Sequence, residues 1–181
     1  MGSNSQILLN HDGSSTEIKV VSAGNPTHVF VLQPAMGVFA KYYQPLAETL
    51  ASKGFAVVLA DLRGNDTSSI RPKPGVDFGY KEMLELDFES VLIFVSEKYE
   101  SLPIYLFGHS LGGQLSCLYA SKYPPKVKGL ILSATCSVYY GGWKGLSKYQ
   151  ILAGTQFANM IAGALGYFPG KNVGFGGTEA R

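Results

Sequence analysis

The chain has 181 residues, of which 46% are hydrophobic and 15% charged. This composition is typical of a globular domain with a hydrophobic core, and it excludes a disordered or collagen-like chain. The 15 basic and 13 acidic residues leave a net charge of only +2 and are scattered along the sequence, which does not indicate a nucleic-acid or polybasic membrane surface. We therefore expect a small-molecule partner.

The predicted elements alternate between strands and helices. An opening β-hairpin is expected at residues 6–10 and 17–22, on either side of a turn-rich segment. Apolar runs predict four further strands, at residues 29–32, 55–61, 104–107 and 127–134. Between these strands, helical periodicity predicts helices at residues 43–50 and 84–99. A third helix is expected at residues 110–122, directly after the strand at 104–107. This order predicts the α/β class, with a mostly parallel sheet covered by helices on both faces.

The character of the sequence changes after Ser137. Aromatic and small residues follow, and the chain then ends in a glycine-rich stretch at residues 170–177. We therefore divide it into a core of residues 1–137 and an appended segment of residues 138–181.

Cysteine usage and the N-terminus bear on location. Cys117 and Cys136 lie in apolar surroundings without C-x-x-C spacing, which favours buried thiols over a disulfide or a metal pair. The N-terminus lacks the basic region and apolar run of a signal peptide, and Gln6 stands where a myristoylation motif needs Ser or Thr. We expect a cytoplasmic protein without a lipid anchor.

The chemistry is expected at Gly108-His109-Ser110-Leu111-Gly112, which fits the G-x-S-x-G nucleophile elbow. Glycines two residues before and after the serine let the backbone turn sharply from strand to helix and expose the serine hydroxyl. The alternative is a chance turn serine. An apolar strand ends at Gly108 and a helix begins at Ser110, and this context favours a catalytic nucleophile.

A nucleophilic serine needs hydrogen-bond donors for the oxyanion that forms on its substrate. The N–H of Leu111 is the first candidate, because it lies at the start of a helix where N–H groups lack intrahelical partners. The second is expected from the loop after the first buried strand, residues 33–37, where small neighbours would let the N–H of Met36 face the site. The alternative for this loop is an ordinary strand-to-helix turn.

Three segments, residues 33–37, 55–64 and 108–113, resemble the bacterial α/β-hydrolases grouped with serine aminopeptidases and monoacylglycerol lipases. The resemblance covers about residues 17–137. It implies an α/β-hydrolase fold, and residues 168–177 resemble the start of a lid in a branch of predicted hydrolases. The resemblance thus implies that residues 138–181 are the beginning of a lid or cap.

The sequence departs from that family pattern at two places. Pro34-Ala35 replaces the His-Gly commonly found before the oxyanion residue. Asn65-Asp66 replaces the His-Gly that usually follows the Asp-x-Arg-Gly loop. The pocket is therefore expected to differ locally from that of better-known relatives.

The acid and the histidine that would complete a catalytic triad are not found after Ser110 in the order that this fold requires. In this fold the chain order is Ser, then Asp or Glu, then His, but only the acidic residue Glu179 and no histidine follow Ser110. His28 opens a strand at the end of the sheet away from the elbow, and His109 adjoins Ser110 on a tight turn, so neither is expected to be the base. We expect the acid and the histidine on a missing C-terminal part with further strands.

Asp61 is the alternative acid, because it ends a strand at the correct edge of the sheet. Capping or tethering the loop that contains Arg63 is the favoured interpretation of this residue. No phosphate loop, dinucleotide fingerprint or metal-spaced His and Cys cluster occurs, so neither a cofactor nor a metal is expected.

The sequence thus predicts a serine hydrolase of esters, thioesters or amides that acts through an acyl-enzyme at Ser110 on a small-molecule acyl substrate. This chain by itself is expected to be inactive, because Ser110 lacks its base. The alternative is a non-catalytic binding or scaffold protein on the same fold.

Two further expectations concern surfaces. A helix near the C-terminus has one apolar face, predicted to pack beneath a lid or to line an acyl pocket, and interruptions by polar residues argue against a membrane span. That face comprises Phe157, Met160, Ile161, Ala164, Leu165 and Phe168. The strand at 127–134 is expected beside that at 104–107 with its other edge bare, so that the chain self-associates through this sheet edge.

Overall fold

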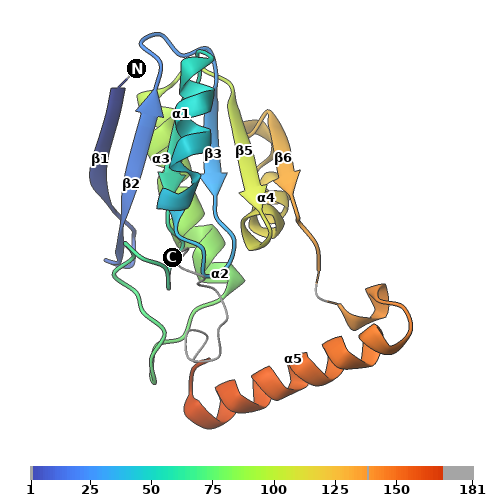
Figure 1. The fold of residues 1–181 in the computed structure, drawn as a ribbon. Helices are drawn as coiled ribbons and strands as arrows, with labels where there is room; N and C mark the ends of the chain where they lie inside the picture. The colour runs from blue at the N-terminus through green and yellow to red at the C-terminus, as the bar shows by residue number, and fades with distance from the viewer. Residues whose placement is uncertain (1, 138, 169–181) are drawn as a thin grey trace. The chain divides into compact units, whose positions relative to one another are not determined.

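The computed structural model describes residues 2–137 and 139–168. By their contacts these residues form two compact units, of which one consists of the chain up to Arg71 with Phe78–Thr135, and the other of Pro72–Asp77 with the chain from Cys136 onward. The first unit holds the sheet and most of the helices, and the second holds the long helix α5 (Figure 1).

The first unit contains six strands in the order β1-β2-β4-β3-β5-β6. Their bounds are Gly2–Leu9 (β1), Ser15–Ser22 (β2), Val29–Gln33 (β3), Ala56–Ala60 (β4), Ile104–His109 (β5) and Gly129–Ser133 (β6). β1 and β2 form the expected hairpin and β2 runs antiparallel to β4, whereas β4, β3, β5 and β6 are parallel. The predicted mostly parallel sheet is confirmed, and β6 does lie beside β5.

Register brings the loops of the candidate site to one edge of the sheet. Gln33 at the end of β3 pairs with Gly108 of β5, and His109 of β5 pairs with Ser133 of β6. Because the carboxyl ends of parallel strands lie at the same edge, the turn after β3 and the turn after β5 meet there.

Helices cover both faces of the sheet. Their bounds are Ala40–Tyr43 (a 3-10 turn), Gln44–Ser52 (α1), Tyr80–Glu82 (α2), Met83–Phe88 (a π-helical turn), Glu89–Lys98 (α3), Leu111–Lys122 (α4) and Pro124–Lys126 (a second 3-10 turn). The helix predicted at residues 84–99 is thus one longer helical stretch with a wide turn inside it. In Figure 1, α1 lies in front of the sheet, and α3 and α4 lie behind it.

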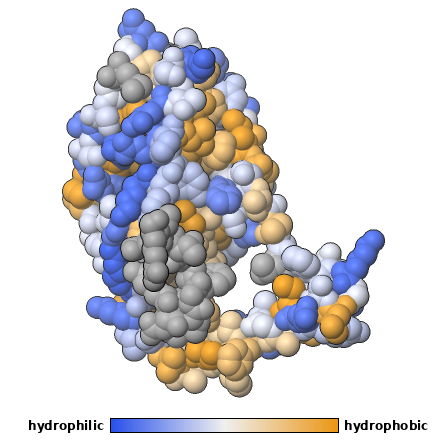
Figure 2. Space-filling model, in the orientation of Figure 1, coloured by the Kyte–Doolittle hydropathy of each residue, from blue (hydrophilic) through white to orange (hydrophobic). Residues whose placement is uncertain are grey.

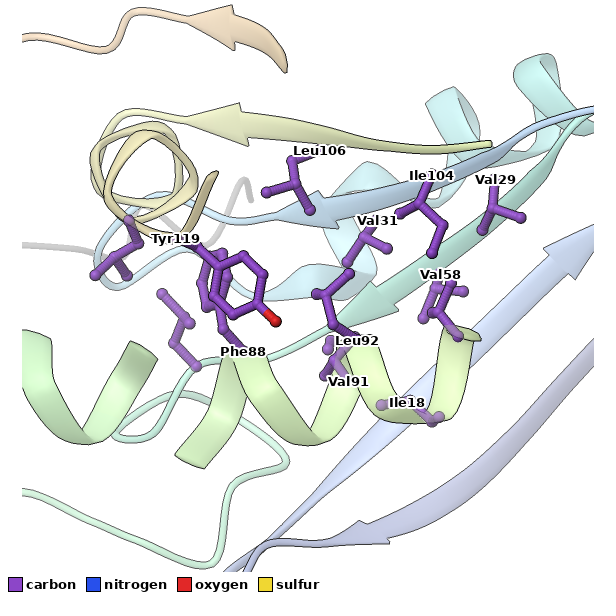
Figure 3. Close-up of a cluster of buried hydrophobic side chains, with 14 of the residues drawn as sticks. Ile18, Val29, Val31, Val58, Phe88, Val91, Leu92, Ile104, Leu106 and Tyr119 are labelled. Atoms are coloured by element: carbon purple, nitrogen blue, oxygen red, sulfur yellow. The ribbon is translucent and has the colours of Figure 1, made fainter. Parts of the chain in front are cut away.

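Side chains that alternate along the strands divide the core into two clusters. The cluster behind the sheet packs strand residues against α3 and α4, and it includes Val29, Val31, Ile104, Leu106, Phe88, Leu92 and Tyr119 (Figure 3). The cluster in front packs Leu32, Val57 and Leu59 against Ala47 and Ala51 of α1. Each buried Leu or Phe contributes about 1.5–3 kcal/mol, so these clusters fix the strands whose ends support the candidate site.

The β6 side of the sheet is poorly covered. Within the described residues β6 pairs only with β5, and Leu130, Ile131 and Leu132 are 37%, 42% and 46% exposed. On this side a hollow of about 320 Å³ is lined by His28, Phe30, Phe55, Tyr105, Gly129, Leu130 and Ile131. Figure 2 shows hydrophobic residues gathered over the part of the sheet that contains β5 and β6.

The expectation that both thiols are buried is wrong. Cys117 on α4 is half-buried, and Cys136 is exposed. Cys136 comes shortly after the edge strand β6, in which residues 130–133 are exposed. Apolar neighbours in the sequence therefore do not ensure that a side chain is buried in the fold.

The second unit contains a 3-10 turn at Tyr140–Gly142 and the helix α5 at Leu146–Leu165. Gly166 follows α5 with φ of 73°, a left-handed conformation that suits glycine and ends a helix. No residue of α5 is buried, and Phe157 is 59% exposed. No helix within the described residues is long and apolar enough to cross a membrane.

Candidate active site

Ser110 lies on a sharp turn between β5 and α4. Its backbone has φ of 51° and ψ of −113°, and among the described residues Ala134 is the only other non-glycine with positive φ. Such a conformation costs a residue with a side chain on the order of 1–3 kcal/mol and persists only where the surrounding structure enforces it. This is the strained strand-to-helix turn that a nucleophile elbow requires.

The glycines around Ser110 are required because a side chain at these positions would clash with neighbouring atoms. A Cβ atom on Gly108 would come within 2.3 Å of the Cα of Gly113, and a Cβ on Gly112 would come within 2.3 Å of the carbonyl oxygen of Gln33. A Cβ on Gly113 would come within 1.8 Å of the Thr135 hydroxyl oxygen. The glycine pattern thus lets helix α4 start directly against the turn after β3.

Two backbone hydrogen bonds hold the elbow in place. The N–H of Ser110 donates to the carbonyl oxygen of Ser133 on β6 at 2.9 Å, and the N–H of Gly112 donates to the carbonyl oxygen of Pro34 at 3.1 Å. The elbow therefore contacts the strand on one side and the turn after β3 on the other. This brings together the two segments in which the sequence predicts oxyanion donors.

Both predicted oxyanion donors have unoccupied N–H groups. Leu111 is the first residue of α4, and Met36 lies in a turn that the N–H of Val38 closes by donating to the carbonyl oxygen of Ala35 at 3.1 Å. Within residues 2–137 and 139–168, neither the Leu111 N–H nor the Met36 N–H has a hydrogen-bond partner, and neither has the Ser110 hydroxyl. Unsatisfied N–H groups beside a serine are what an oxyanion hole offers.

Tyr43 joins the two segments through its side chain. The N–H of Ala35 donates to the Tyr43 hydroxyl at 3.2 Å, and the same hydroxyl lies 2.7 Å from Nδ1 of His109. The two rings also make an edge-to-face contact at 6.0 Å between centroids. From the sequence, Tyr43 is only the first residue of the helix expected at residues 43–50, and no signal in the sequence indicates where its hydroxyl lies.

The described histidines form no hydrogen bond with the Ser110 hydroxyl. His109 uses Nδ1 for the contact with Tyr43, and Nδ1 of His28 lies 2.9 Å from the Thr27 hydroxyl, at the opposite end of β3 from Gln33. His11 lies in the turn of the β1–β2 hairpin. The part of the chain that the structure describes also brings no three His, Cys, Asp or Glu side chains together as a metal site.

Asp61, the alternative catalytic acid, uses its carboxylate to hold two neighbouring segments together. Its side chain accepts hydrogen bonds from the N–H of Ala40 at 2.7 Å and from the hydroxyl of Thr67 at 2.9 Å. Burial raises the pKa of Asp61, and these hydrogen bonds oppose that effect. The carboxylate thus links the end of β4 to the segment that follows the Met36 turn.

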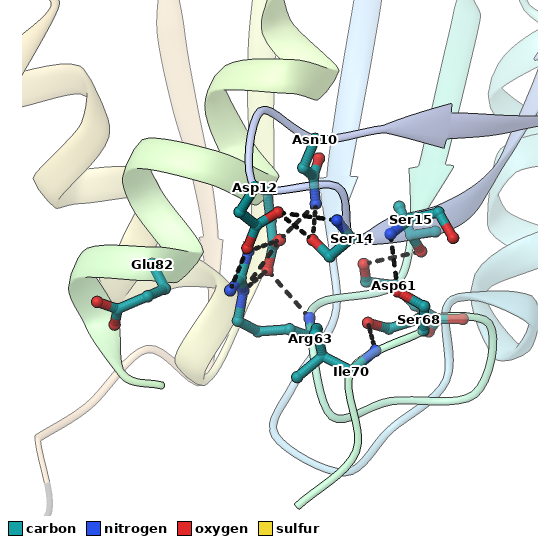
Figure 4. Close-up of polar contacts among 12 residues, drawn as sticks. Asn10, Asp12, Ser14, Ser15, Asp61, Arg63, Ser68, Ile70 and Glu82 are labelled. Carbon is teal, nitrogen blue, oxygen red and sulfur yellow. Dashed lines mark hydrogen bonds and ion pairs between the residues drawn. The ribbon is translucent and has the colours of Figure 1, made fainter. Parts of the chain in front are cut away.

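A buried ion pair anchors the loop after β4. Arg63, whose side chain is 4% exposed, donates from Nε and Nη2 to both carboxylate oxygens of Asp87, with the Nη2–Oδ1 distance 2.8 Å. Asp12 and Asn10 of the hairpin turn complete the cluster through Arg63 and Asp87 respectively (Figure 4). Asp87 lies in the π-helical turn, so this irregular turn is the point to which the loop and the hairpin are tied.

A model of the family described as serine aminopeptidase, S33, matches residues 24–163. The chain belongs to the serine aminopeptidase S33 family. The match includes the Met36 turn, Asp61, the elbow and most of α5. The resemblance that the sequence suggests is therefore confirmed.

Curated relatives of this S33 family chain include lipases. It is 26% identical over 111 residues to the monoacylglycerol lipase of Mycolicibacterium smegmatis, covering 60% of this chain and 38% of that protein. It is 29% identical over 115 residues to the phospholipase YtpA of Bacillus subtilis, covering 63% of this chain and 42% of that protein. The chain therefore spans about two fifths of the length of these relatives.

A solved structure shows the same fold as this S33 family chain. The α/β hydrolase GrgF from Penicillium sp. sh18 superimposes with a TM-score of 0.64 at 18% identity, over 73% of this chain and 45% of that one. The mostly parallel sheet with helices on both faces is thus an α/β-hydrolase fold.

Proposed function

We propose that this protein is a serine hydrolase that cleaves an ester, thioester or amide through an acyl-enzyme at Ser110. The observation that carries the proposal is the backbone of Ser110, held at φ of 51° between a parallel strand and a helix. A turn serine without a role gains nothing from this strain, whereas a nucleophile gains an exposed hydroxyl next to unoccupied N–H groups. The family and its lipase relatives support the same chemistry and favour esters among the three substrate classes.

In the proposed reaction the Ser110 hydroxyl oxygen attacks the carbonyl carbon of the substrate, and the carbonyl electron pair moves onto its oxygen. The hydroxyl proton passes to a general base and then to the departing alcohol, thiol or amine. The N–H groups of Leu111 and Met36 donate to the oxyanion in this step. Water then attacks the acyl-enzyme and releases the acid, and the Ser110 hydroxyl regains its proton.

The experiment that tests this proposal is labelling with a fluorophosphonate probe, which reacts with activated serine hydroxyls. We expect labelling of a form of the protein that contains the general base for Ser110, with complete loss in the Ser110→Ala variant. Ser121→Ala, at an exposed position near the end of the same helix, is the matched control and should label like the wild type. Undiminished labelling of Ser110→Ala would contradict the assignment.

A non-catalytic binding protein on the same fold is the second candidate. It is favoured by the lack of a base: no described histidine hydrogen-bonds to the Ser110 hydroxyl, and none follows Ser110 in the 181-residue sequence. For this reason we propose that the 181-residue chain alone shows no esterase turnover above background. Turnover of p-nitrophenyl esters by this chain would show that one of its three histidines serves the serine, and would exclude the binding protein.

Two further proposals concern the segments away from the elbow. The segment after Ser137 is the beginning of a lid, and the apolar face of α5 serves either for packing beneath that lid or as the wall of an acyl pocket. The bare edge of β6 pairs with another copy of the chain, because an exposed apolar edge strand is a template for strand addition.

A further inference from the structure

The candidate site is assembled from two segments that are distant in the sequence. The turn after β3 carries Met36, and the elbow after β5 carries Ser110 and Leu111. A productive oxyanion hole needs its two donors about 2.7–3.1 Å from one oxygen atom, so the spacing of these segments must be held closely. Backbone contact between Gly112 and Pro34 supplies one link.

A second link runs through the side chain of Tyr43, at the end of the 3-10 turn before α1. Its hydroxyl lies 3.2 Å from the N–H nitrogen of Ala35, the residue before Met36, and 2.7 Å from Nδ1 of His109, the residue before Ser110. One oxygen atom thus contacts the neighbours of the nucleophile and of an oxyanion donor at the same time.

The direction of these hydrogen bonds follows from the groups involved. A backbone N–H can only donate, so the Tyr43 hydroxyl oxygen accepts from Ala35. The hydroxyl proton then needs an acceptor, and among the described residues Nδ1 of His109 is the one in contact with it. Nδ1 is therefore the acceptor, and the neutral His109 ring carries its proton on Nε2. Burial raises the pKa of Tyr43, which keeps this hydroxyl protonated and able to donate.

We propose that Tyr43 is a positioning residue, whose hydroxyl sets the spacing between the turn that carries Met36 and the elbow that carries Ser110. The proposal rests on the serine hydrolase function proposed above. A displacement of about 1 Å in a catalytic arrangement can reduce the rate by about 100-fold, so the loss of a single link is measurable. Because the other link is formed by backbone atoms, Tyr43 is the part of this connection that a conservative substitution can remove.

Tyr43→Phe removes the hydroxyl and keeps the ring that packs on His109. Tyr42→Phe is the matched control: it makes the same change one residue earlier, where the side chain is exposed and stacks on Phe39. The first measurement is the ¹⁵N spectrum of the histidine rings by magic-angle-spinning NMR, which tolerates self-association. With only three histidines, His109 is assigned by substituting His11 and His28.

We expect the His109 Nδ1 resonance of the wild type to be that of a hydrogen-bonded acceptor in a ring protonated on Nε2. This signature should disappear in Tyr43→Phe and stay unchanged in Tyr42→Phe. The second measurement uses a form of the protein that contains the general base for Ser110. In it the rate of fluorophosphonate labelling at Ser110 should fall by about 10- to 100-fold in Tyr43→Phe and by less than about twofold in Tyr42→Phe. If Tyr43→Phe does not fold, His109→Phe removes the same hydrogen bond from its other end.

The outcomes separate the two proposals. An unchanged His109 resonance in Tyr43→Phe overturns the hydrogen bond, whatever the labelling rate. A changed resonance with an unchanged labelling rate shows that Tyr43 orients His109 alone, and it overturns the positioning role. If neither the wild type nor Tyr42→Phe is labelled, the hydrolase function fails and the positioning role fails with it, while the NMR result still reports on the contact itself.

Discussion

The backbone N–H of Gly112 donates a hydrogen bond to the carbonyl oxygen of Pro34 at 3.1 Å. This contact is direct because Gly112 has no side chain, and the carbonyl group of Gln33 occupies the space that a Cβ atom would need. The +2 glycine of the elbow is therefore the point at which helix α4 rests on the turn after β3. Neighbouring glycines of the motif meet different obstacles, so their replacements should have different consequences.

We expect Gly112→Ala to destabilise the protein by about 1–3 kcal/mol and to abolish labelling at Ser110. The new methyl group would clash with backbone atoms, which cannot move away as a side chain can. Gly113→Ala meets the side chain of Thr135 instead. Adding Thr135→Gly should therefore restore stability to Gly113→Ala and leave Gly112→Ala unimproved. Urea unfolding of the single and double variants measures this, and equal rescue of both would contradict the steric account.

Asp61→Asn should lower the free energy of unfolding by about 1–3 kcal/mol. The carboxylate accepts hydrogen bonds from Ala40 and Thr67, and an amide would present a donor to groups that themselves donate. Asp66→Asn is the control: its carboxylate makes an exposed ion pair with Lys41, so about 0–1 kcal/mol is expected. Equal losses in chemical denaturation would show that Asp61 is not a tether.

The contribution of Asp12 to stability should depend on pH. Burial alone would raise its pKa, but the hydrogen bonds from Ser14 and the charge of Arg63 outweigh burial and lower the pKa of Asp12. A carboxylate with a folded-state pKa below the unfolded value of about 3.9 stabilises the fold above that pH, and this stability is lost as the pH falls through the folded-state pKa. The difference in unfolding free energy between wild type and Asp12→Asn should thus be largest near neutral pH and shrink below about pH 4. A difference that stays constant from pH 7 to pH 3 would be inconsistent with this.

If α5 lines an acyl pocket, Phe157→Asp should reduce turnover of long-chain esters far more than that of acetyl esters. The assay requires a form of the protein that hydrolyses esters. Gln156→Asp is the control, because it places the same charge on α5 outside the apolar face that contains Phe157. Equal losses on both ester lengths, or equal effects of the two variants, would reject the acyl-wall role.

The 181-residue chain should associate through the edge of β6. Ile131→Lys is expected to increase the monomer fraction, since a lysine on an edge strand opposes strand addition. Leu118→Lys removes a similarly exposed apolar side chain from α4 and should leave association unchanged. Size-exclusion chromatography with light scattering distinguishes these cases, and a monomeric wild type would dismiss the idea.

Periodicity and turn residues are sufficient to predict the strands and the elbow, because both depend on local sequence. The run that ends at Gly108 predicts β5, and the glycines around Ser110 predict the turn that the structure shows. Tyr43 could not be assigned a polar role, because its partners, Ala35 and His109, meet only when β3 and β5 pair. Cys136 was assigned wrongly for the same kind of reason: exposure depends on which elements cover β6 and not on neighbours in the chain.

The hydrogen bond from Ser110 to Ser133 couples the conformation of Ser110 to the pairing of β6 with the rest of the sheet. β6 is the edge strand with the least burial among the parallel strands, and edge strands open locally at lower free energy than central ones. Each opening that reaches Ser133 removes the brace of a strained residue, so the observed reactivity equals the intrinsic reactivity multiplied by the fraction of molecules with β6 closed. Under the proposed function, any molecule that caps β6 would therefore activate Ser110 without touching it, by up to the reciprocal of that fraction.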